Sequence, residues 1–324
     1  MHCDRIIFFV LKKYYLKNGD ALNYNIIKKG DILYMNECFT PNEIAKNTIN
    51  VGIKKANMPM TTTLILAVLA GMFIAFASEG SNMAAFNLFA KPETYGLGKV
   101  IAGSIFGTGL MLVILCGGEL FTGNTLIIIS VLKGQVKFSK MLKNWSIVYL
   151  GNFIGSVFVA YMMVQSGLFN SGANVLGGVT IKIASYKVGL PFMSALYLGI
   201  MCNILVCLAV WMAYGAKSMV GKIFAIFFPI WLFITSGFEH SIANMYYIPA
   251  GIMSKANAVW VTTSGLSPEK LAGLNWETFI TKNLIPVTIG NIIGGAIFVG
   301  MAYWFAYLKA PNKEIYEVIN NKSA

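Results

Sequence analysis

Six long apolar stretches that lack any charged side chain dominate this sequence. They cover residues 61–78, 100–118, 144–169, 188–216, 223–238 and 283–308. A transmembrane helix needs about 20 such residues to cross ~30 Å of hydrocarbon. The core of a soluble domain can hide one or two stretches of this kind but not six. We therefore predict an all-α integral membrane protein with six transmembrane helices.

The distribution of lysines between these stretches indicates how the chain is oriented. Lysines without neighbouring acids follow the second and fourth stretches, at Lys133, Lys137, Lys140, Lys143, Lys217 and Lys222. The opposite loops mix lysines with glutamates. By the positive-inside rule, we expect a multi-pass protein of the plasma (inner) membrane with both termini in the cytoplasm. The net charge of +12 is then an orientation signal, and no nucleic-acid partner is predicted.

Four segments are expected along the chain. Residues 1–34 form an N-terminal extension, 35–60 a cytoplasmic amphipathic helix, 61–308 the transmembrane domain and 309–324 a cytoplasmic tail. The amphipathic helix is indicated by Thr40-Pro41-Asn42-Glu43, which has the form of a capping box with proline at the first helical position. Our hypothesis is that Met35 is the natural start and that residues 1–34 are translated upstream sequence, which the nucleotide sequence of the gene would test.

An internal repeat relates the third apolar stretch to the sixth. Lys143 begins KNWSIVYLGNFIGS and Lys282 begins KNLIPVTIGNIIGG, so Lys-Asn, Gly-Asn and Ile-Gly recur at a constant separation of 139 residues. The first copy starts at the expected cytoplasmic end and the second at the outer end. The two halves are therefore predicted to be inverted three-helix repeats, related by a pseudo-twofold axis in the membrane plane. Such folds hold their sites between the repeats.

The middle segment of each half is too long for one straight helix. At about 1.5 Å per residue, residues 100–132 and 223–253 would each extend far beyond ~30 Å of hydrocarbon. We predict that helices 2 and 5 are broken at CGGELFTGN (116–124) and SGFEHSIAN (236–244). Unwound backbone cannot face lipid, because its unpaired N–H and C=O groups are costly there. These polar segments therefore mark a pathway at mid-membrane depth.

Most polar side chains of the breaks are predicted to support the structure. Glu119 and Glu239 are expected to accept hydrogen bonds from N–H groups freed at the breaks, since a carboxylate facing the path would repel an anion. The same supporting role is predicted for Asn124, Asn244, Asn152 and Asn291.

His240 is different, because it is one of two histidines and the only one within a span. An ionisable side chain inside a membrane is a functional candidate by default. Thr122 lies at the corresponding position of the first break and can offer a hydroxyl proton.

At SGFEHSIANMYYIPAG, GELFTGN and NLIPVTIGNIIGG, the sequence closely resembles the formate/nitrite transporter family. The similarity runs from about Met35 to Leu308. It implies an aquaporin-like protomer of six helices that assembles as a homopentamer, with a pore for small monovalent anions in each protomer.

The resemblance also implies roles for individual residues. His240 in FEHS resembles the central pore histidine of the family, and Thr122 in ELFT resembles its hydroxyl partner. Asn203, in MCNILVCLAVW, resembles the asparagine that borders the outer vestibule, and Lys187, in SYKVGLPF, resembles the lysine whose charge attracts anions. The apolar constriction of the family is matched by Phe106, Leu110 and Phe233.

The predicted function is transport of small monovalent weak-acid anions, by an anion channel or a proton-coupled pathway with a central histidine. Formate is the first choice, because NLIPVTIGNIIGG and CLAVWMAYG look closest to formate channels. Nitrite or hydrosulfide is the alternative cargo, and acetate and lactate are further candidates.

A bare anion has a large desolvation cost at an apolar constriction, whereas its conjugate acid has a small one. Lys187 would concentrate the anion, and Thr122 and His240 would bind it while a proton, delivered directly or through water, neutralises it.

Two other functional classes are open at this stage. A membrane enzyme would need a metal cluster or a nucleophile with its base, and two histidines without paired cysteine spacing build neither. No catalytic residue, metal or cofactor is therefore predicted. A structural or sensory membrane protein needs no polar break around a mid-membrane histidine. A bound metal would favour the first class, and absence of solute flux would favour the second.

Overall fold

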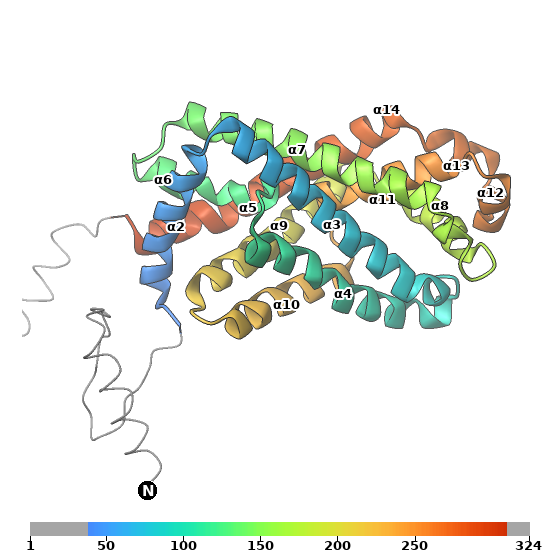
Figure 1. Cartoon of the computed structure of the whole chain (residues 1–324), viewed down its shortest axis with the longest axis horizontal. Helices are drawn as coiled ribbons and strands as arrows, with labels where there is room; N and C mark the ends of the chain where they lie inside the picture. The colour runs from blue at the N-terminus through green and yellow to red at the C-terminus, as the bar shows by residue number, and fades with distance from the viewer. Residues whose placement is uncertain (1–37, 310–324) are drawn as a thin grey trace, which may run out of the picture. The chain divides into compact units, whose positions relative to one another are not determined.

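The computed structural model describes residues 38–309, whose regular elements are all helices (Figure 1). The α-helices are α2 (Pro41–Ala56), α3 (Met60–Phe89), α4 (Tyr95–Leu112), α5 (Phe121–Asn124), α6 (Ile128–Leu132), α7 (Phe138–Gln165), α8 (Val175–Val188), α9 (Phe192–Gly215), α10 (Met219–Ser236), α11 (Ser241–Ser254), α12 (Ala258–Ser264), α13 (Pro268–Gly273), α14 (Trp276–Thr278), α15 (Ile285–Ile292) and α16 (Ala302–Tyr307). The predicted extension 1–34, the proposed start at Met35 and nearly all of the predicted tail lie outside the described residues.

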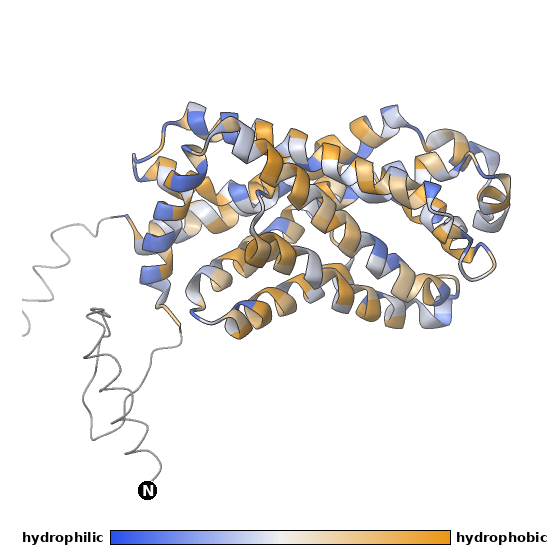
Figure 2. Ribbon diagram, in the orientation of Figure 1, coloured by the Kyte–Doolittle hydropathy of each residue, from blue (hydrophilic) through white to orange (hydrophobic). Residues whose placement is uncertain are grey.

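Six helical segments of the described chain are long and apolar enough to cross a membrane. They are Met60–Phe89, Pro92–Gly117, Phe138–Gln165, Phe192–Gly215, Met219–Ser236 and Trp276–Tyr307. These segments coincide with the six predicted stretches, so the expected all-α membrane fold is confirmed. Hydrophobic residues dominate α3, α4 and α10 in Figure 2, whereas hydrophilic residues gather on α2 and in the connections. Large apolar side chains such as Phe76, Phe158 and Phe228 remain exposed, as a lipid-facing surface requires.

The second and fifth spans are each followed by a short non-helical segment and a further helix. α4 continues into the π-helical turn Val113–Gly117, and residues 118–120 are not helical before α5 begins. α10 ends at Ser236, and its C-terminal cap Gly237 has a φ of +78°, in the left-handed region that favours glycine. Residues 238–240 then precede α11. Both interruptions fall within the polar segments of the sequence.

Close helix contacts depend on glycines at corresponding positions of the sequence repeat. A Cβ on Gly155 in α7 would meet the backbone oxygen of Val68 in α3. A Cβ on Gly294, in the π-helical continuation of α15, would meet the backbone oxygen of Ile200 in α9. Larger residues would therefore force these helix pairs apart.

α2 begins with the capping box that the sequence predicts. The Thr40 hydroxyl accepts a hydrogen bond from the Glu43 N–H at 3.4 Å, and the Glu43 carboxylate accepts one from the Thr40 N–H at 2.8 Å. Pro41 occupies the first helical position. Ile44 and Thr48 are buried, and α2 packs against α6 and α9. The α2 helix is thereby held against the spans.

Helices occupy two regions where the sequence predicted loops, α8 in the first and α12, α13 and the start of the sixth span in the second. α8 occupies residues that have no long uncharged stretch, and it is packed between α11 and α12. The sixth span begins at Trp276 rather than at Asn283, since Asn275 caps it. Lys187 consequently lies in the last turn of α8. Tertiary packing and capping, rather than hydropathy, determine both regions.

Candidate functional site

Each break lines a cavity of its own. The α2 cavity has a volume of about 310 Å³ and is lined by residues that include Val51, Lys55, Leu110, Glu119 and Tyr214. The α8 cavity has a volume of about 610 Å³ and is lined by residues that include Lys99, Ala102, Lys182, Lys187 and Glu239. Each cavity therefore contains lysines, one break glutamate and a stretch of α4.

α4 leads from one cavity to the other through an apolar barrier. Ala102 lines the α8 cavity and Leu110 lines the α2 cavity. Phe106 lies between them, one helical turn from each, because side chains four residues apart share a helix face. Its ring meets that of Phe233 edge-to-face, with 5.5 Å between the ring centroids, and the two side chains are only 2% and 1% exposed. Phe106 and Phe233 thus form a buried apolar barrier on the face of α4 between Ala102 and Leu110, and the role of Phe106, Leu110 and Phe233 as a constriction stays a prediction.

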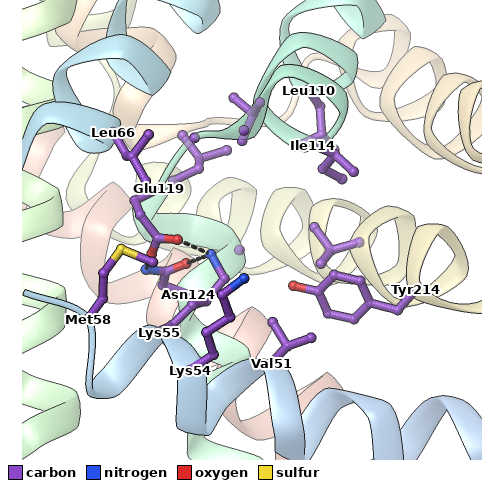
Figure 3. A pocket seen from close by; sticks show the side chains of 16 residues that line it. Val51, Lys54, Lys55, Met58, Leu66, Leu110, Ile114, Glu119, Asn124 and Tyr214 are labelled. Atoms are coloured by element: carbon purple, nitrogen blue, oxygen red, sulfur yellow. Dashed lines mark hydrogen bonds and ion pairs between the residues drawn. The ribbon is translucent and has the colours of Figure 1, made fainter. Parts of the chain in front are cut away.

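A charged network closes around the first break in the wall of the α2 cavity (Figure 3). Lys55 Nζ lies 2.7 Å from Glu119 Oε1 and donates to Asn124 Oδ1 at 2.9 Å. The Asn124 amide donates to Glu119 Oε2 at 2.7 Å and to Asn144 Oδ1 at 2.9 Å. The carboxylate is therefore neutralised by an ammonium group and oriented by an asparagine.

The second break carries a matching network in the wall of the α8 cavity. Lys187 Nζ lies 2.7 Å from Glu239 Oε1. The Asn244 amide donates to Glu239 Oε2 and to Asn283 Oδ1, both at 2.7 Å. The Asn283 amide donates to the Lys187 backbone oxygen at 3.0 Å, as the Asn144 amide does to that of Lys55 at 3.2 Å.

Two further asparagines satisfy the backbone groups that the breaks leave open. Asn152 donates to the Glu119 backbone oxygen at 2.9 Å and accepts from the Phe121 N–H at 2.9 Å. Asn291 donates to the Glu239 backbone oxygen at 3.0 Å and accepts from the Ser241 N–H at 2.9 Å. Buried backbone groups without such partners would be destabilising, so these amides support the non-helical segments.

The partners of the two glutamates differ from the expectation. Glu119 and Glu239 were predicted to accept from freed backbone N–H groups, whereas their carboxylates bond to lysine and asparagine side chains. Their own N–H groups instead donate to the backbone oxygens of Leu66 and Leu198. A carboxylate removed from water is stabilised far more by an ammonium group than by a backbone dipole.

Thr122 and His240, from the two break segments, are in contact. Thr122 Oγ1 lies 3.0 Å from His240 Nε2, and the two residues are 0% and 3% exposed. The His240 ring stacks beside Phe233 at a centroid distance of 6.0 Å. The pair therefore adjoins the apolar barrier, and neither residue lines a cavity.

Hydrogen bonding determines the tautomer of His240. The residue caps α11, and its Nδ1 accepts a hydrogen bond from the Ala243 N–H at 3.1 Å. A nitrogen that accepts this bond carries no hydrogen, so the neutral ring has its hydrogen on Nε2. That hydrogen points to Thr122, which leaves the threonine hydroxyl hydrogen free to reach another acceptor.

Asn203 is buried rather than in the wall of either cavity. Its amide donates to the Asn291 backbone oxygen at 2.6 Å, to the Thr122 backbone oxygen at 3.2 Å and to Thr125 Oγ1 at 3.3 Å. It therefore connects the first break to the sixth span behind Thr122. Its predicted contact with the outer vestibule stays a prediction.

Lys55, Asn144 and Asn283 are the site residues that the sequence reasoning missed. Asn144 and Asn283 form the Lys-Asn pairs that open the two copies of the repeat, so the repeat carried a signal for them. Lys55 carried no signal, because it lies in the last turn of α2 beside Lys54 and looks like a solvated lysine. Only its distance to Glu119 distinguishes it.

A family model described as formate/nitrite transporter matches residues 42–305 of the chain. The chain belongs to the formate/nitrite transporter family. It is 40% identical over 271 residues to formate channel FocA of Escherichia coli K12, an alignment that covers 83% of this chain and 94% of that protein. A formate channel FocA of Haemophilus influenzae is 39% identical, with coverages of 81% and 92%.

Solved structures of formate/nitrite transporters share the fold. A pentameric formate channel with formate bound is 39% identical, with a TM-score of 0.69, over 79% of this chain and 99% of that one. An FNT family ion channel is 28% identical, with a TM-score of 0.66, over 84% and 98%. The family expected from the motifs is confirmed, and the relatives named here are channels rather than enzymes.

Proposed function

We propose that this chain transports small monovalent weak-acid anions, with formate as the main cargo, across the plasma membrane. The observation that carries the proposal is the position of Thr122 and His240, which lie 3.0 Å apart beside the Phe106–Phe233 barrier. A cavity that contains lysines lies on either side of this pair. The relatives named formate channels support formate over nitrite and hydrosulfide.

The electrostatics of the path favour a protonated cargo at the barrier. The lysines of each cavity raise the local concentration of anions. A bare anion between Phe106 and Phe233 would lose its hydration without compensation, whereas the neutral acid loses little. Thr122 holds the anion through its hydroxyl hydrogen while a proton neutralises it. We infer that this proton comes from hydronium of the bulk solution and reaches the anion through water in the cavity, because Nδ1 of His240 is engaged and Nε2 carries the only ring hydrogen.

His240 then acts as a fixed hydrogen-bond donor. Its Nε2–H orients the Thr122 hydroxyl, and the start of α11 immediately after it adds the positive end of a helix dipole. Both contributions favour an anion over a cation at the centre of the path.

We also propose the architecture that the sequence predicts. The Lys55–Glu119–Asn124–Asn144 and Lys187–Glu239–Asn244–Asn283 networks correspond residue for residue, which supports two inverted repeats. The basic loops support cytoplasmic termini, with the α2 cavity open to the cytoplasm. The pentameric relative supports a homopentamer with one pathway in each protomer.

Stopped-flow flux into proteoliposomes tests the proposal. Formate, nitrite, hydrosulfide, acetate, lactate and chloride are compared at two external pH values. We expect formate to move fastest and its uptake to rise as the external pH falls, because more of the anion is neutralised. Faster flux of nitrite or hydrosulfide would contradict formate as the main cargo. Absence of flux for every anion would contradict the proposal that the chain is a transporter.

The role of the histidine is tested with His240→Asn, whose amide can still cap α11 and donate a hydrogen bond. Reduced formate flux with the pH dependence retained is expected for a donor that does not relay the proton. Loss of the pH dependence would assign the proton step to His240 itself. Unchanged flux at both pH values would show that the ring has no role in transport.

A further inference from the structure

The α8 cavity carries positive charge that the ion pair at its wall does not neutralise. Three lysines line it, Lys99, Lys182 and Lys187, with a single acidic residue, Glu239. Glu239 is engaged by Lys187 at 2.7 Å. Neither Lys99 nor Lys182 forms an ion pair within the part of the chain that the structure describes. Two ammonium groups of this cavity therefore lack an anionic partner.

The ammonium group of Lys99 is placed so that it can contact a ligand in the α8 cavity. It lies near the start of α4, and its Nζ is 3.5 Å from the position that a Cβ on Gly237 would take. The same ammonium lies 5.7 Å from the centroid of the Tyr95 ring. The cation thus lies between an aromatic face and the backbone of the second break.

The wall of the cavity also contains a buried donor without a partner. Asn82 is 2% exposed, and its Nδ2 has no hydrogen-bond acceptor among residues 38–309. The Thr235 hydroxyl, in the same wall, is likewise unpartnered among those residues. Leaving a buried polar group without a partner has a free-energy cost. An acceptor atom brought by a ligand would remove this cost.

The size and walls of the cavity indicate a ligand larger than formate. Its volume of about 610 Å³ lies within the ~300–1,000 Å³ that is typical of sites for organic ligands. Aromatic side chains line it, namely Phe89, Tyr95, Tyr186, Phe238 and Tyr247. An aromatic ring fits such walls through offset or edge-to-face contacts. Phe106 and Phe233 are the next residues along the proposed path, and their edge-to-face contact leaves no opening for an aromatic ring.

We propose that the α8 cavity is a binding site for an aromatic carboxylate. Its carboxylate group binds Lys99 and Lys182 and accepts a hydrogen bond from Asn82, while its ring lies against the aromatic wall. Such a ligand cannot pass the Phe106–Phe233 barrier. It remains in the cavity and obstructs the path from that side.

Binding is tested with benzenesulfonate, a permanent anion that has the same ring and cannot cross as a neutral acid. Isothermal titration calorimetry on the full chain in detergent needs no transport, so its result is independent of the cargo. We expect binding of benzenesulfonate at least tenfold tighter than binding of methanesulfonate, which has the charge without the ring. Equal affinity for the two anions would contradict the proposal that the ligand is aromatic. Binding of neither anion would contradict the proposal that the α8 cavity is a binding site.

Variants locate the site. Lys99→Met and Lys182→Met are each expected to weaken binding about tenfold, whereas the matched control Lys282→Met, an exposed lysine outside the cavity, leaves it unchanged. An equal loss of affinity in all three variants would show that only the overall charge of the protein matters, and would contradict a site in the α8 cavity.

Asn82→Leu separates a ligand contact from a structural role. Leucine removes the unpartnered donor, so the ligand-free variant is expected to unfold at a higher temperature while it binds benzenesulfonate more weakly. A lower unfolding temperature with unchanged binding would show that Asn82 only supports the fold. In proteoliposomes, external benzenesulfonate is expected to slow anion flux in the unmodified chain and not in Lys99→Met.

Discussion

Glu239 binds the ammonium group of Lys187 at 2.7 Å inside a wall where the two side chains are only 2% and 12% exposed. Removing one member of such a pair leaves the other charge buried without compensation, which costs about 3–5 kcal/mol. Glu239→Gln is therefore expected to lower the thermal unfolding temperature of the detergent-purified protein markedly. The double variant Glu239→Gln with Lys187→Met should recover most of the loss, since no charge is left unpaired. Equal destabilisation of the single and double variants would contradict this coupling.

Thr122→Val tests the hydroxyl at the centre of the proposed path. Valine keeps the shape of threonine, so the fold is expected to be retained. A lost hydrogen bond to an anion is worth roughly 1.5 kcal/mol or more, and formate flux should fall about tenfold. Thr122→Ser keeps the hydroxyl and is the matched control, for which flux should stay close to that of the unmodified chain. Equal flux through the valine and serine variants would exclude a role for the hydroxyl.

The capping box of α2 is expected to respond to acid. Hydrogen bonds from the Thr40 N–H and the Thr40 hydroxyl lower the pKa of Glu43 below its usual range, with smaller contributions from Lys217 and Lys46. A depressed pKa in the folded state means that the carboxylate contributes stability at neutral pH. This contribution is lost as the pH falls through the lowered pKa.

Hydrogen exchange of the first-turn amides of α2 checks this expectation. Protection should decrease in acid in the unmodified chain and change less in Glu43→Gln, which lacks the titrating group. The same acid dependence in both proteins would assign the effect to another group.

Glu79, a buried acid on α3, is expected to make the loss of one hydrogen-bond partner more destabilising than the loss of both. Glu79 Oε2 accepts a hydrogen bond from the Tyr246 hydroxyl, and its Oε1 has no partner among the residues with a described position. Tyr246→Phe leaves the carboxyl without its donor and should destabilise the protein by about 1–3 kcal/mol. Glu79→Leu combined with Tyr246→Phe replaces both partners by apolar groups and should be nearly neutral. Thermal unfolding of the three proteins distinguishes these outcomes, and a double variant as unstable as Tyr246→Phe would contradict the explanation.

Hydropathy was sufficient to predict the six spans, because a bilayer requires long uncharged helices whatever their tertiary contacts. It could not predict α8, which is stabilised by packing between α11 and α12. The motif around His240 led to the pair with Thr122, since Thr122 lies at the corresponding position of the first break. Lys55 could not be recognised, because nothing in its local sequence distinguishes an ammonium group that reaches a buried glutamate from one that faces water.

The roles of individual charges were harder to predict than their positions. Lys187 was expected to attract anions, and the structure adds an ion pair with Glu239 that the sequence did not predict. The hydrogen-bond acceptor at Nδ1 of His240 is likewise a property of the folded backbone, since the Ala243 N–H reaches it only after α11 has formed. Sequence patterns identify residue types, whereas protonation and pairing depend on which atoms the fold brings within 3 Å or so of each other.

The two matched lysine, glutamate and asparagine networks have a consequence for the direction of flow. In the transport that we propose, an anion meets a paired lysine and glutamate on each side of Phe106 and Phe233. The cavities around these pairs differ, because the α8 cavity is larger and also contains Lys99 and Lys182. The matched networks by themselves therefore set no direction of flow, and any preference would come from the gradients of anion and proton or from this difference in charge.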